Sequence, residues 1–273
     1  MKTLRLMAIL AHPDDESLGF GGTLASYAAE GIRVTLVTAT RGDRGRYQGR
    51  RPGEDGHPGQ SALAALREQE LRAASSALGI SDVTVLDYGD QQLAASRAHA
   101  VISDIAVRIR AERPDVVVTF GMDGAYGHPD HIAISHFTSA AIVVAASVTP
   151  ISDARVSEPH VVSKLYHLAW PAVTFAAYQE VFGELTSTVD GTVRRVTPTP
   201  EWAISADIDA TAVLPTVLRA ALCHDSQVAA RERLGAVSPE QLAAIWARQS
   251  FYRVFSNVDV GAARETDLFA GLR

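Results

Sequence analysis

Strand-like and helix-like segments alternate through the first half of the sequence, and this alternation restricts the fold more than any other feature. Strand-like stretches lie at residues 4–10, 32–40, 82–88 and 115–120, and helical periodicity lies between them, at residues 23–30, 61–78 and 94–112. The fourth strand (DVVVTF) has the apolar centre expected of a strand buried on both faces of a parallel sheet. Alternation of this kind with right-handed crossovers predicts an α/β fold with a Rossmann-like, mostly parallel sheet flanked by helices.

The second half of the sequence is less regular. A helix is predicted at residues 129–147 and strands at residues 164–169 and 203–208, while residues 175–200 follow no assignable pattern. We predict a Rossmann-like catalytic core at residues 1–150. Residues 151–273 are expected to form a smaller C-terminal α+β portion, packed on the same domain and completing the substrate pocket.

Two clusters of titratable residues follow predicted strands. The first strand ends abruptly in residues 12–16 (HPDDE), and the fourth strand is followed by residues 127–131 (GHPDH). Open α/β sheets bind their ligands at the carboxyl ends of the strands, so both clusters are expected at the same edge. Within each cluster the potential ligands are three residues apart, a spacing that brings side chains to one side where the chain turns.

Two imidazoles and one carboxylate form a common catalytic zinc site that leaves a coordination position for water. The metal lowers the pKa of that water toward neutrality. A single histidine at a strand end is more often a packing residue that forms a hydrogen bond. Packing does not explain both clusters well, because burying Asp14, Asp15, Glu16 and Asp130 without a cation would be costly.

Residues 41–60 interrupt the pattern with six glycines, two prolines and five arginines. Irregular loops of this length are usually functional or mobile. Two interpretations stay open at this point, a lid over the substrate and a solvated insertion.

The composition excludes several classes of partner. A formal net charge of −6 argues against a nucleic acid or an anionic membrane as the main partner, since either needs a concentrated basic face. The apolar run before His12 is too short for a secretory signal, and no run approaches the roughly 20 residues that span a bilayer. A single cysteine excludes an intrachain disulfide. We therefore expect a cytoplasmic protein that acts on a small molecule.

The two clusters, AHPDDE at residues 11–16 and GHPDH at residues 127–131, resemble the signatures of the LmbE-like (PIG-L) family of zinc-dependent N-deacetylases. The similarity covers roughly residues 4–147. It implies hydrolysis of the N-acetyl or N-acyl group of an N-acetylglucosamine conjugate, which releases acetate and a free amine. It also implies a Zn²⁺ cofactor, with Fe²⁺ or another divalent metal as the alternative in the cell.

The resemblance assigns roles residue by residue. It implies that the metal is held by His12, Asp15 and His131. Asp14 becomes the general base, since it adjoins a ligand and can face the water without occupying the metal. A protonated His128 would stabilise the oxyanion or protonate the departing amine, and Tyr126 would polarise the amide carbonyl.

The resemblance also implies that Arg67 and Asp90 bind the sugar. For Arg67 the alternative is an ion pair with Glu70 on a solvated helix face. Glu16 is expected either to fix a ligand histidine or to cap the helix that follows it. His224 is expected either to form a hydrogen bond to a residue that binds the metal or to act as a charge at a helix end.

Three other functions stay open. Two histidines and one carboxylate also describe the iron site of Fe(II) oxygenases, although a base such as Asp14 and a parallel α/β pattern favour hydrolysis. A zinc amidase acting on a thiol-sugar conjugate is a closer alternative. A nucleotide-binding module is suggested by residues 19–22 (GFGG), but Leu24 stands where its fingerprint requires glycine.

Overall fold

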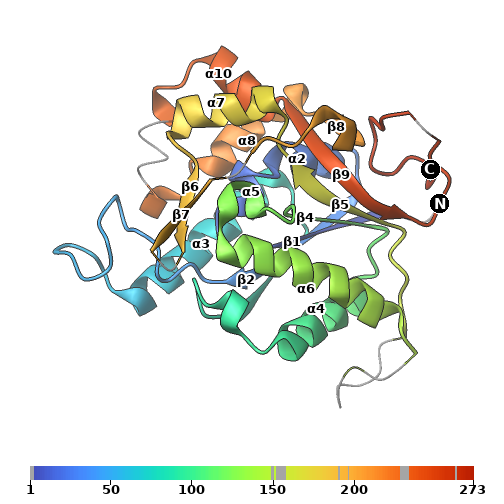
Figure 1. Cartoon of the computed structure of the whole chain (residues 1–273), viewed down its shortest axis with the longest axis horizontal. Coiled ribbons are helices and arrows are strands. Elements are labelled where there is room, and N and C mark those ends of the chain that lie inside the picture. Colours follow the sequence, from blue (N-terminus) through green and yellow to red (C-terminus); the bar gives the residue numbers. More distant parts are fainter. Residues whose placement is uncertain are drawn as a thin grey trace.

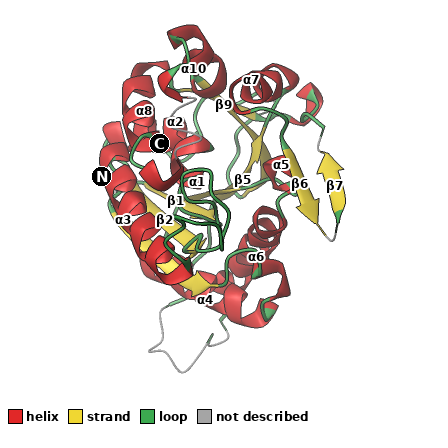
Figure 2. Ribbon diagram, turned by 90° about the vertical axis from the view of Figure 1, so that its left-hand side faces the viewer, coloured by secondary structure: helices red, strands yellow, loops and turns green. Residues whose placement is uncertain are grey.

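A seven-stranded sheet runs through the centre of the protein, with helices on both of its faces (Figures 1 and 2). The computed structural model describes residues 3–148, 151, 158–189, 191–195, 197–227, 234–261 and 263–273. The strand order is β3-β2-β1-β4-β5-β9-β8, and β6 and β7 form a separate two-stranded sheet. The predicted mostly parallel, Rossmann-like fold is confirmed.

The first five strands are parallel to one another: β1 (Arg5–Leu10), β2 (Arg33–Thr40), β3 (Asp82–Tyr88), β4 (Val116–Thr119) and β5 (Lys164–Ala169). The chain builds β2 and β3 on one side of β1, then returns to build β4 and β5 on the other side. The strand order therefore reverses between β1 and β4. In open α/β sheets such a reversal opens a crevice at the carboxyl ends of the two strands.

Six helices belong to this first part: α1 (Asp15–Leu18), α2 (Gly21–Ala29), α3 (Gln60–Leu78), α4 (Ala98–Glu112), α5 (Gly124–Gly127) and α6 (Pro129–Ala146). α4 and α6 pack together on one face of the sheet, and α2 and α3 lie on the other face (Figure 1). The helix predicted at residues 94–112 is interrupted, because the backbone at Ser96 is extended between a short 3₁₀ turn and α4.

The C-terminal part comprises α7 (Ala172–Phe182), β6 (Thr186–Val189), β7 (Thr192–Arg195), β8 (Ala206–Asp209), α8 (Leu214–Ala221), α10 (Pro239–Trp246) and β9 (Arg248–Ser256). β9 is antiparallel to both β5 and β8, so this part extends the main sheet. The domain boundary expected after residue 150 falls on a stretch outside the described residues, and the division into two portions stays a prediction.

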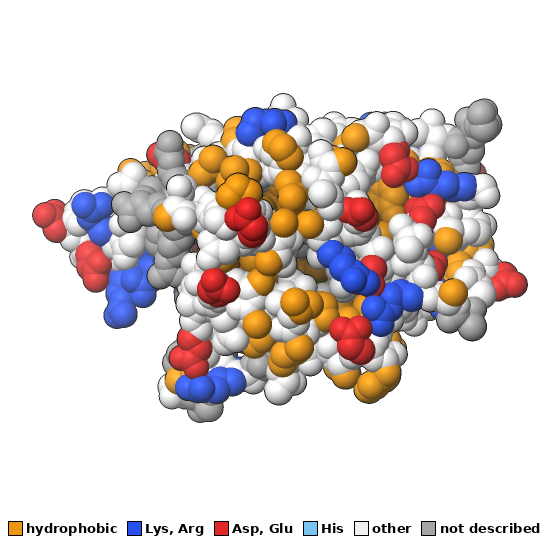
Figure 3. Space-filling view, turned by 90° about the horizontal axis from the view of Figure 1, so that it is seen from above, with side chains coloured by type: hydrophobic (Ala, Val, Ile, Leu, Met, Phe, Trp, Pro, Cys, Tyr) orange, Lys and Arg blue, Asp and Glu red, His pale blue; other side chains and the backbone are white. Residues whose placement is uncertain are grey.

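The surface gives two further results. No helix in the described ranges is both long enough and apolar enough to cross a membrane. Figure 3 views the side of the molecule on which α7 and α10 lie, and there basic and acidic side chains are mixed among apolar ones. This face lacks the concentrated basic surface that nucleic-acid binding requires.

Candidate active site

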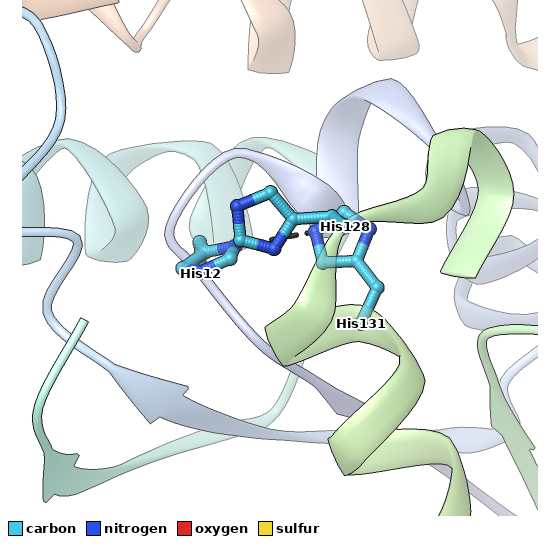
Figure 4. Close-up of side chains that lie close together, drawn as sticks. All are labelled: His12, His128 and His131. Carbon is cyan, nitrogen blue, oxygen red and sulfur yellow. Dashed lines mark hydrogen bonds between the residues drawn. The ribbon is translucent and has the colours of Figure 1, made fainter. Parts of the chain in front are cut away.

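The two sequence clusters meet at the point where the strand order reverses. β1 pairs directly with β4, so the loop after β1 and the segment that leads from β4 into α6 leave the sheet side by side. His12 follows β1, and His131 lies in the first turn of α6, whose first residue is Pro129. Although these histidines are 119 residues apart in the chain, His12 Nδ1 lies 3.2 Å from His131 Nε2 (Figure 4).

Asp15 completes a set of three converging ligand atoms. Its Oδ1 lies 3.3 Å from His131 Nε2, and its Oδ2 lies 3.8 Å from His12 Nδ1. All three side chains are buried. A tetrahedral ion with ligand bonds of about 2.0–2.1 Å separates its donor atoms by about 3.3–3.4 Å. The two separations at His131 Nε2, 3.2 Å and 3.3 Å, match this value, so His12, Asp15 and His131 can hold a divalent metal ion.

The charge around His12 also fits a cation. Its outer nitrogen, Nε2, lies 3.2 Å from Asp130 Oδ2 and 3.3 Å from Asp90 Oδ1. Burial favours the neutral imidazole, but these carboxylates and Asp15 raise the pKa of His12 to about 10 in the metal-free chain. The cluster thus has an excess of negative charge, which a divalent ion would balance.

Sequence reasoning gave Asp130 no role. Its Oδ2 accepts a hydrogen bond from the backbone amide of Gln91 at 2.7 Å, and its Oδ1 accepts one from the backbone amide of Leu93 at 3.1 Å. The carboxylate is thereby fixed against the outer nitrogen of His12. A carboxylate in this position holds a metal-binding imidazole in one orientation. The available signal was an acidic residue directly before a predicted ligand.

Asp90, like Asp130, lies against the outer nitrogen of His12. It is 3% exposed, and its Oδ2 accepts a hydrogen bond of 2.8 Å from the Arg44 amide. Burial alone would raise the pKa of Asp90, but its hydrogen bond to His12 and the Arg44 amide hold the pKa at about 2. Asp90 therefore lies next to the predicted metal site as an ionised carboxylate, and its contact with a sugar stays a prediction.

Asp14 lies beside the ligand set in a strained conformation. Its φ is 108°, a value that non-glycine residues rarely adopt. Such strain is often found at functional sites. The backbone N–H of Asp14 donates to Glu16 Oε2 at 3.0 Å, and its Oδ2 accepts from Arg67 Nη2 at 3.1 Å. Burial raises the pKa of Asp14 to about 6, although Arg67 opposes this shift.

Arg67 is 4% exposed on α3 and points into the site. Its guanidinium donates to the Gly42 carbonyl at 2.8 Å and to the Pro13 carbonyl, in addition to Asp14. Its interpretation as a solvated ion-pair partner of Glu70 is wrong, because Glu70 instead binds Ser226 through the amide and hydroxyl, both at 2.6 Å. The predicted sugar contact of Arg67 is a separate question, and it stays a prediction.

The surroundings of His128 favour its neutral form. Its Nδ1 accepts a hydrogen bond of 3.2 Å from the Asp130 amide, so the ring proton is assigned to Nε2. Burial and the neighbouring rings of His12 and His131 lower the pKa of His128 to about 3. A buried site beside two other imidazoles disfavours a further positive charge, and the expected role of a protonated His128 stays a prediction.

The ring of Tyr126 lies against the rings of His128 and His131. Its ring centre is 5.2 Å from that of His131 and 5.8 Å from that of His128. Burial and the nearby carboxylates raise the pKa of Tyr126, so its hydroxyl stays protonated and can donate a hydrogen bond. The preceding residue, Ala125, has a φ of 65°, which breaks the helical path of α5 at this point.

Glu16 and His224 form a buried pair behind Asp14. Glu16 is fully buried, and its Oε1 lies 2.7 Å from His224 Nε2 and accepts from Ser17 Oγ at 2.6 Å. Burial disfavours the charged imidazole, but the Glu16 carboxylate raises the pKa of His224. Among the hydrogen bonds of the described residues, Glu16 has none with His12 or His131; its Oε2 instead accepts one from the Asp14 backbone N–H.

We expect Glu16→Ala to lower the free energy of unfolding by about 3–5 kcal/mol, because it leaves His224 buried without its ion-pair partner. Urea denaturation of the metal-free protein measures this loss. Glu30→Ala is the matched control, since Glu30 pairs with Arg273 at the surface and its loss should cost less than about 1 kcal/mol. Equal losses in the two variants would contradict the predicted stabilisation.

The long loop at residues 41–60 is tied to the same region. The backbone amide of Gln48 donates to the Ser226 carbonyl at 2.7 Å, and the Gln227 side chain donates to the Arg46 carbonyl at 2.9 Å. The Arg44 amide, from the start of the same loop, donates to Asp90 beside the site. Residues 48–56 are exposed, and the choice between a lid and a solvated insertion stays a prediction.

The sheet reversal, the converging histidines and the adjacent carboxylates together define an α/β enzyme with a buried centre for a divalent metal. A family model described as PIG-L: GlcNAc-PI de-N-acetylase matches residues 7–142. A 1D-myo-inositol 2-acetamido-2-deoxy-alpha-D-glucopyranoside deacetylase from Kineococcus radiotolerans is 33% identical over 98% of this chain and 83% of that protein. The chain belongs to the PIG-L, or LmbE-like, family.

Several solved structures are similar to this chain in fold. N,N'-diacetylchitobiose deacetylase from Pyrococcus horikoshii has a TM-score of 0.66 at 20% identity, over 92% of this chain and 83% of that one. The 4-carboxy-2-hydroxymuconate hydratase GalB from Pseudomonas putida has a TM-score of 0.71 at 19% identity, over 96% and 100%. A deacetylase and a hydratase thus share this fold, so the reaction must be argued from the site.

Proposed function

We propose that the protein is a zinc-dependent N-deacetylase that hydrolyses the N-acetyl group of an N-acetylglucosamine conjugate. The observation that carries this proposal is the geometry at the end of β1, where potential metal ligands from three residues converge beside Asp14, a carboxylate outside that set. The relatives named as deacetylases of such a conjugate support it, since one of them aligns with 98% of the chain.

The divalent ion would be held by His12, Asp15 and His131, and it would lower the pKa of water and polarise an amide carbonyl. Asp14 takes the proton of the attacking water. Its pKa of about 6 suits this role, because a general base works best when its pKa lies near the operating pH. Arg67 keeps enough of the carboxylate ionised by opposing the effect of burial.

Two hydrogen-bond donors face the developing charge on the amide oxygen. The Nε2–H of neutral His128 is one, and the protonated hydroxyl of Tyr126 is the other. As the C–N bond breaks, Asp14 returns its proton to the amine nitrogen. Neutral His128 thus serves as a hydrogen-bond donor, and one carboxylate accounts for both proton transfers. Asp90 and Arg67 are proposed to orient the sugar.

Chelation separates hydrolysis from oxygen chemistry. Removing the metal should abolish acetate release from an N-acetylglucosamine conjugate, and zinc should restore it without consumption of oxygen. Acetate release and oxygen uptake are measured in parallel after addition of zinc or of Fe²⁺. Oxygen uptake coupled to product formation in the iron-loaded protein would favour the oxygenase. Cleavage of a cysteinyl-glucosamine amide in place of the acetyl group would favour the thiol-sugar amidase.

A further inference from the structure

A cavity of about 160 Å³ opens beside Asp14, Asp15 and His131. Its remaining walls are almost wholly apolar. They are formed by residues of α1, of the segment after β4 and of α7 with the loop that follows it, among them Leu18, Phe120, Trp170, Tyr178, Phe182 and Leu185. Nothing in the proposed deacetylation uses most of these side chains.

Ring stacking and hydrogen bonds fix the position of the aromatic side chains in this wall. The ring of Tyr178 stacks on Trp170 at a distance of 4.4 Å, and Phe182 continues the stack at 5.7 Å from Tyr178. The hydroxyl of Tyr178 donates to the carbonyl of Leu18 at 2.5 Å, and the indole of Trp246 donates to the same carbonyl at 3.0 Å. The polar atom of Tyr178 is therefore engaged, and its ring is presented to the cavity in a fixed position.

The cavity and the proposed sugar-binding residues lie on opposite sides of the metal centre. Asp90 follows β3, while Trp170 follows β5, and in the sheet β3 and β5 flank the β1–β4 pair from opposite directions. Neither Asp90 nor Arg67 lines the cavity. An amide has two substituents, so a sugar bound on the side of β3 directs the acyl group toward the side of β5.

The size of the cavity exceeds what an acetyl group needs. The methyl of an acetyl group is comparable to a water molecule, which occupies about 30 Å³, whereas an apolar cavity of about 150 Å³ binds benzene. We propose that this cavity is an acyl-binding pocket, and that the enzyme removes apolar N-acyl groups of up to about six carbons more efficiently than acetyl. The proposal rests on the proposed N-deacylation at this site and specifies its substrate class.

The test is a series of N-acyl-D-glucosamines with acetyl, propionyl, butanoyl and hexanoyl groups, assayed with the zinc-loaded full chain. Each methylene buried in an apolar site contributes about 0.8 kcal/mol, or about a fourfold gain. We expect kcat/KM to rise about fourfold per added methylene until the pocket is full. An equal or falling kcat/KM from acetyl to hexanoyl would overturn the proposal while leaving the deacetylase function intact.

Substitutions in the wall make the test specific. Leu185→Trp should lower the ratio of hexanoyl to acetyl kcat/KM at least tenfold, because the indole fills the pocket. Val173→Trp is the control, since Val173 is 73% exposed on α7, the helix that precedes Leu185, and should leave the ratio unchanged. Phe182→Ala enlarges the pocket and should move the optimum to longer chains. If Leu185→Trp does not fold, as judged by circular dichroism, Phe182→Ala alone decides.

A binding measurement separates the two proposals. Isothermal titration of zinc-loaded Asp14→Asn protein should give tighter binding of N-hexanoyl-D-glucosamine than of N-acetyl-D-glucosamine. If the unaltered protein hydrolyses neither this series nor an N-acetylglucosamine conjugate, the proposed function fails, and tighter hexanoyl binding still supports the pocket. Equal binding of the two sugars rejects the pocket whatever the activity.

Discussion

Asp14→Asn should lower kcat by at least about a hundredfold while the metal stays bound. The amide of asparagine preserves the size of the side chain but cannot take a proton from water, and general bases typically contribute factors of about 10²–10⁴. Asp14 lies beside the three converging ligand atoms and is not one of them, so its loss should leave the metal-ligand set complete. Acetate release and metal content of the same preparation measure both effects.

Asp87→Asn is the control for this prediction, because the Asp87 side chain is 80% exposed on β3 and lies outside the site. It should retain full activity. Loss of the metal from Asp14→Asn would make Asp14 a ligand, and unchanged turnover would remove it from the mechanism altogether.

His131→Ala should remove the bound metal and lower kcat/KM by at least about a thousandfold. The ion supplies several kcal/mol of transition-state stabilisation, and each 1.36 kcal/mol corresponds to a factor of ten. With His131 absent, His12 and Asp15 alone remain of the three converging ligands. Metal analysis after dialysis and the rate of acetate release test this prediction.

His136→Ala provides the matched control, since His136 lies five residues further along α6 and is exposed. It should keep both metal and activity. His131 also stacks on Phe120 with ring centres 3.9 Å apart, so circular dichroism must show that His131→Ala is folded. Retention of a full equivalent of metal by the folded variant would contradict the proposed ligand set.

Local patterns in the sequence predicted the elements that carry the site. The strands Asp82–Tyr88 and Lys164–Ala169 have the predicted bounds, and Pro129 opens its helix as expected. β-branched runs and helix-initiating prolines act within a few residues, so a single sequence displays them. The β6–β7 hairpin and most of α7 lie in the region without an assignable pattern. Apolar residues also stand on the exposed face of α7, such as Val173, which is 73% exposed, so its helical periodicity is weak in the sequence.

The roles of individual side chains were harder to predict, since they depend on partners distant in the chain. The burial of Arg67 follows from the approach of α3 to the loop after β1, and the lowered pKa of His128 follows in part from rings contributed by both clusters. Asp130 is fixed by two backbone amides from the segment after β3. None of these contacts produces a periodic pattern in the sequence.

The pairing of Glu16 with His224 has a consequence for the order in which the protein is made. Synthesis proceeds from the N-terminus, and both clusters of proposed metal ligands leave the ribosome long before the residues around position 224. Until His224 arrives, Glu16 lacks the partner that keeps its charge in the interior, and the backbone of Asp14 lacks its anchored acceptor. A nascent or truncated chain that ends before this point would contain every proposed ligand and the base, yet would not hold the base in its working position.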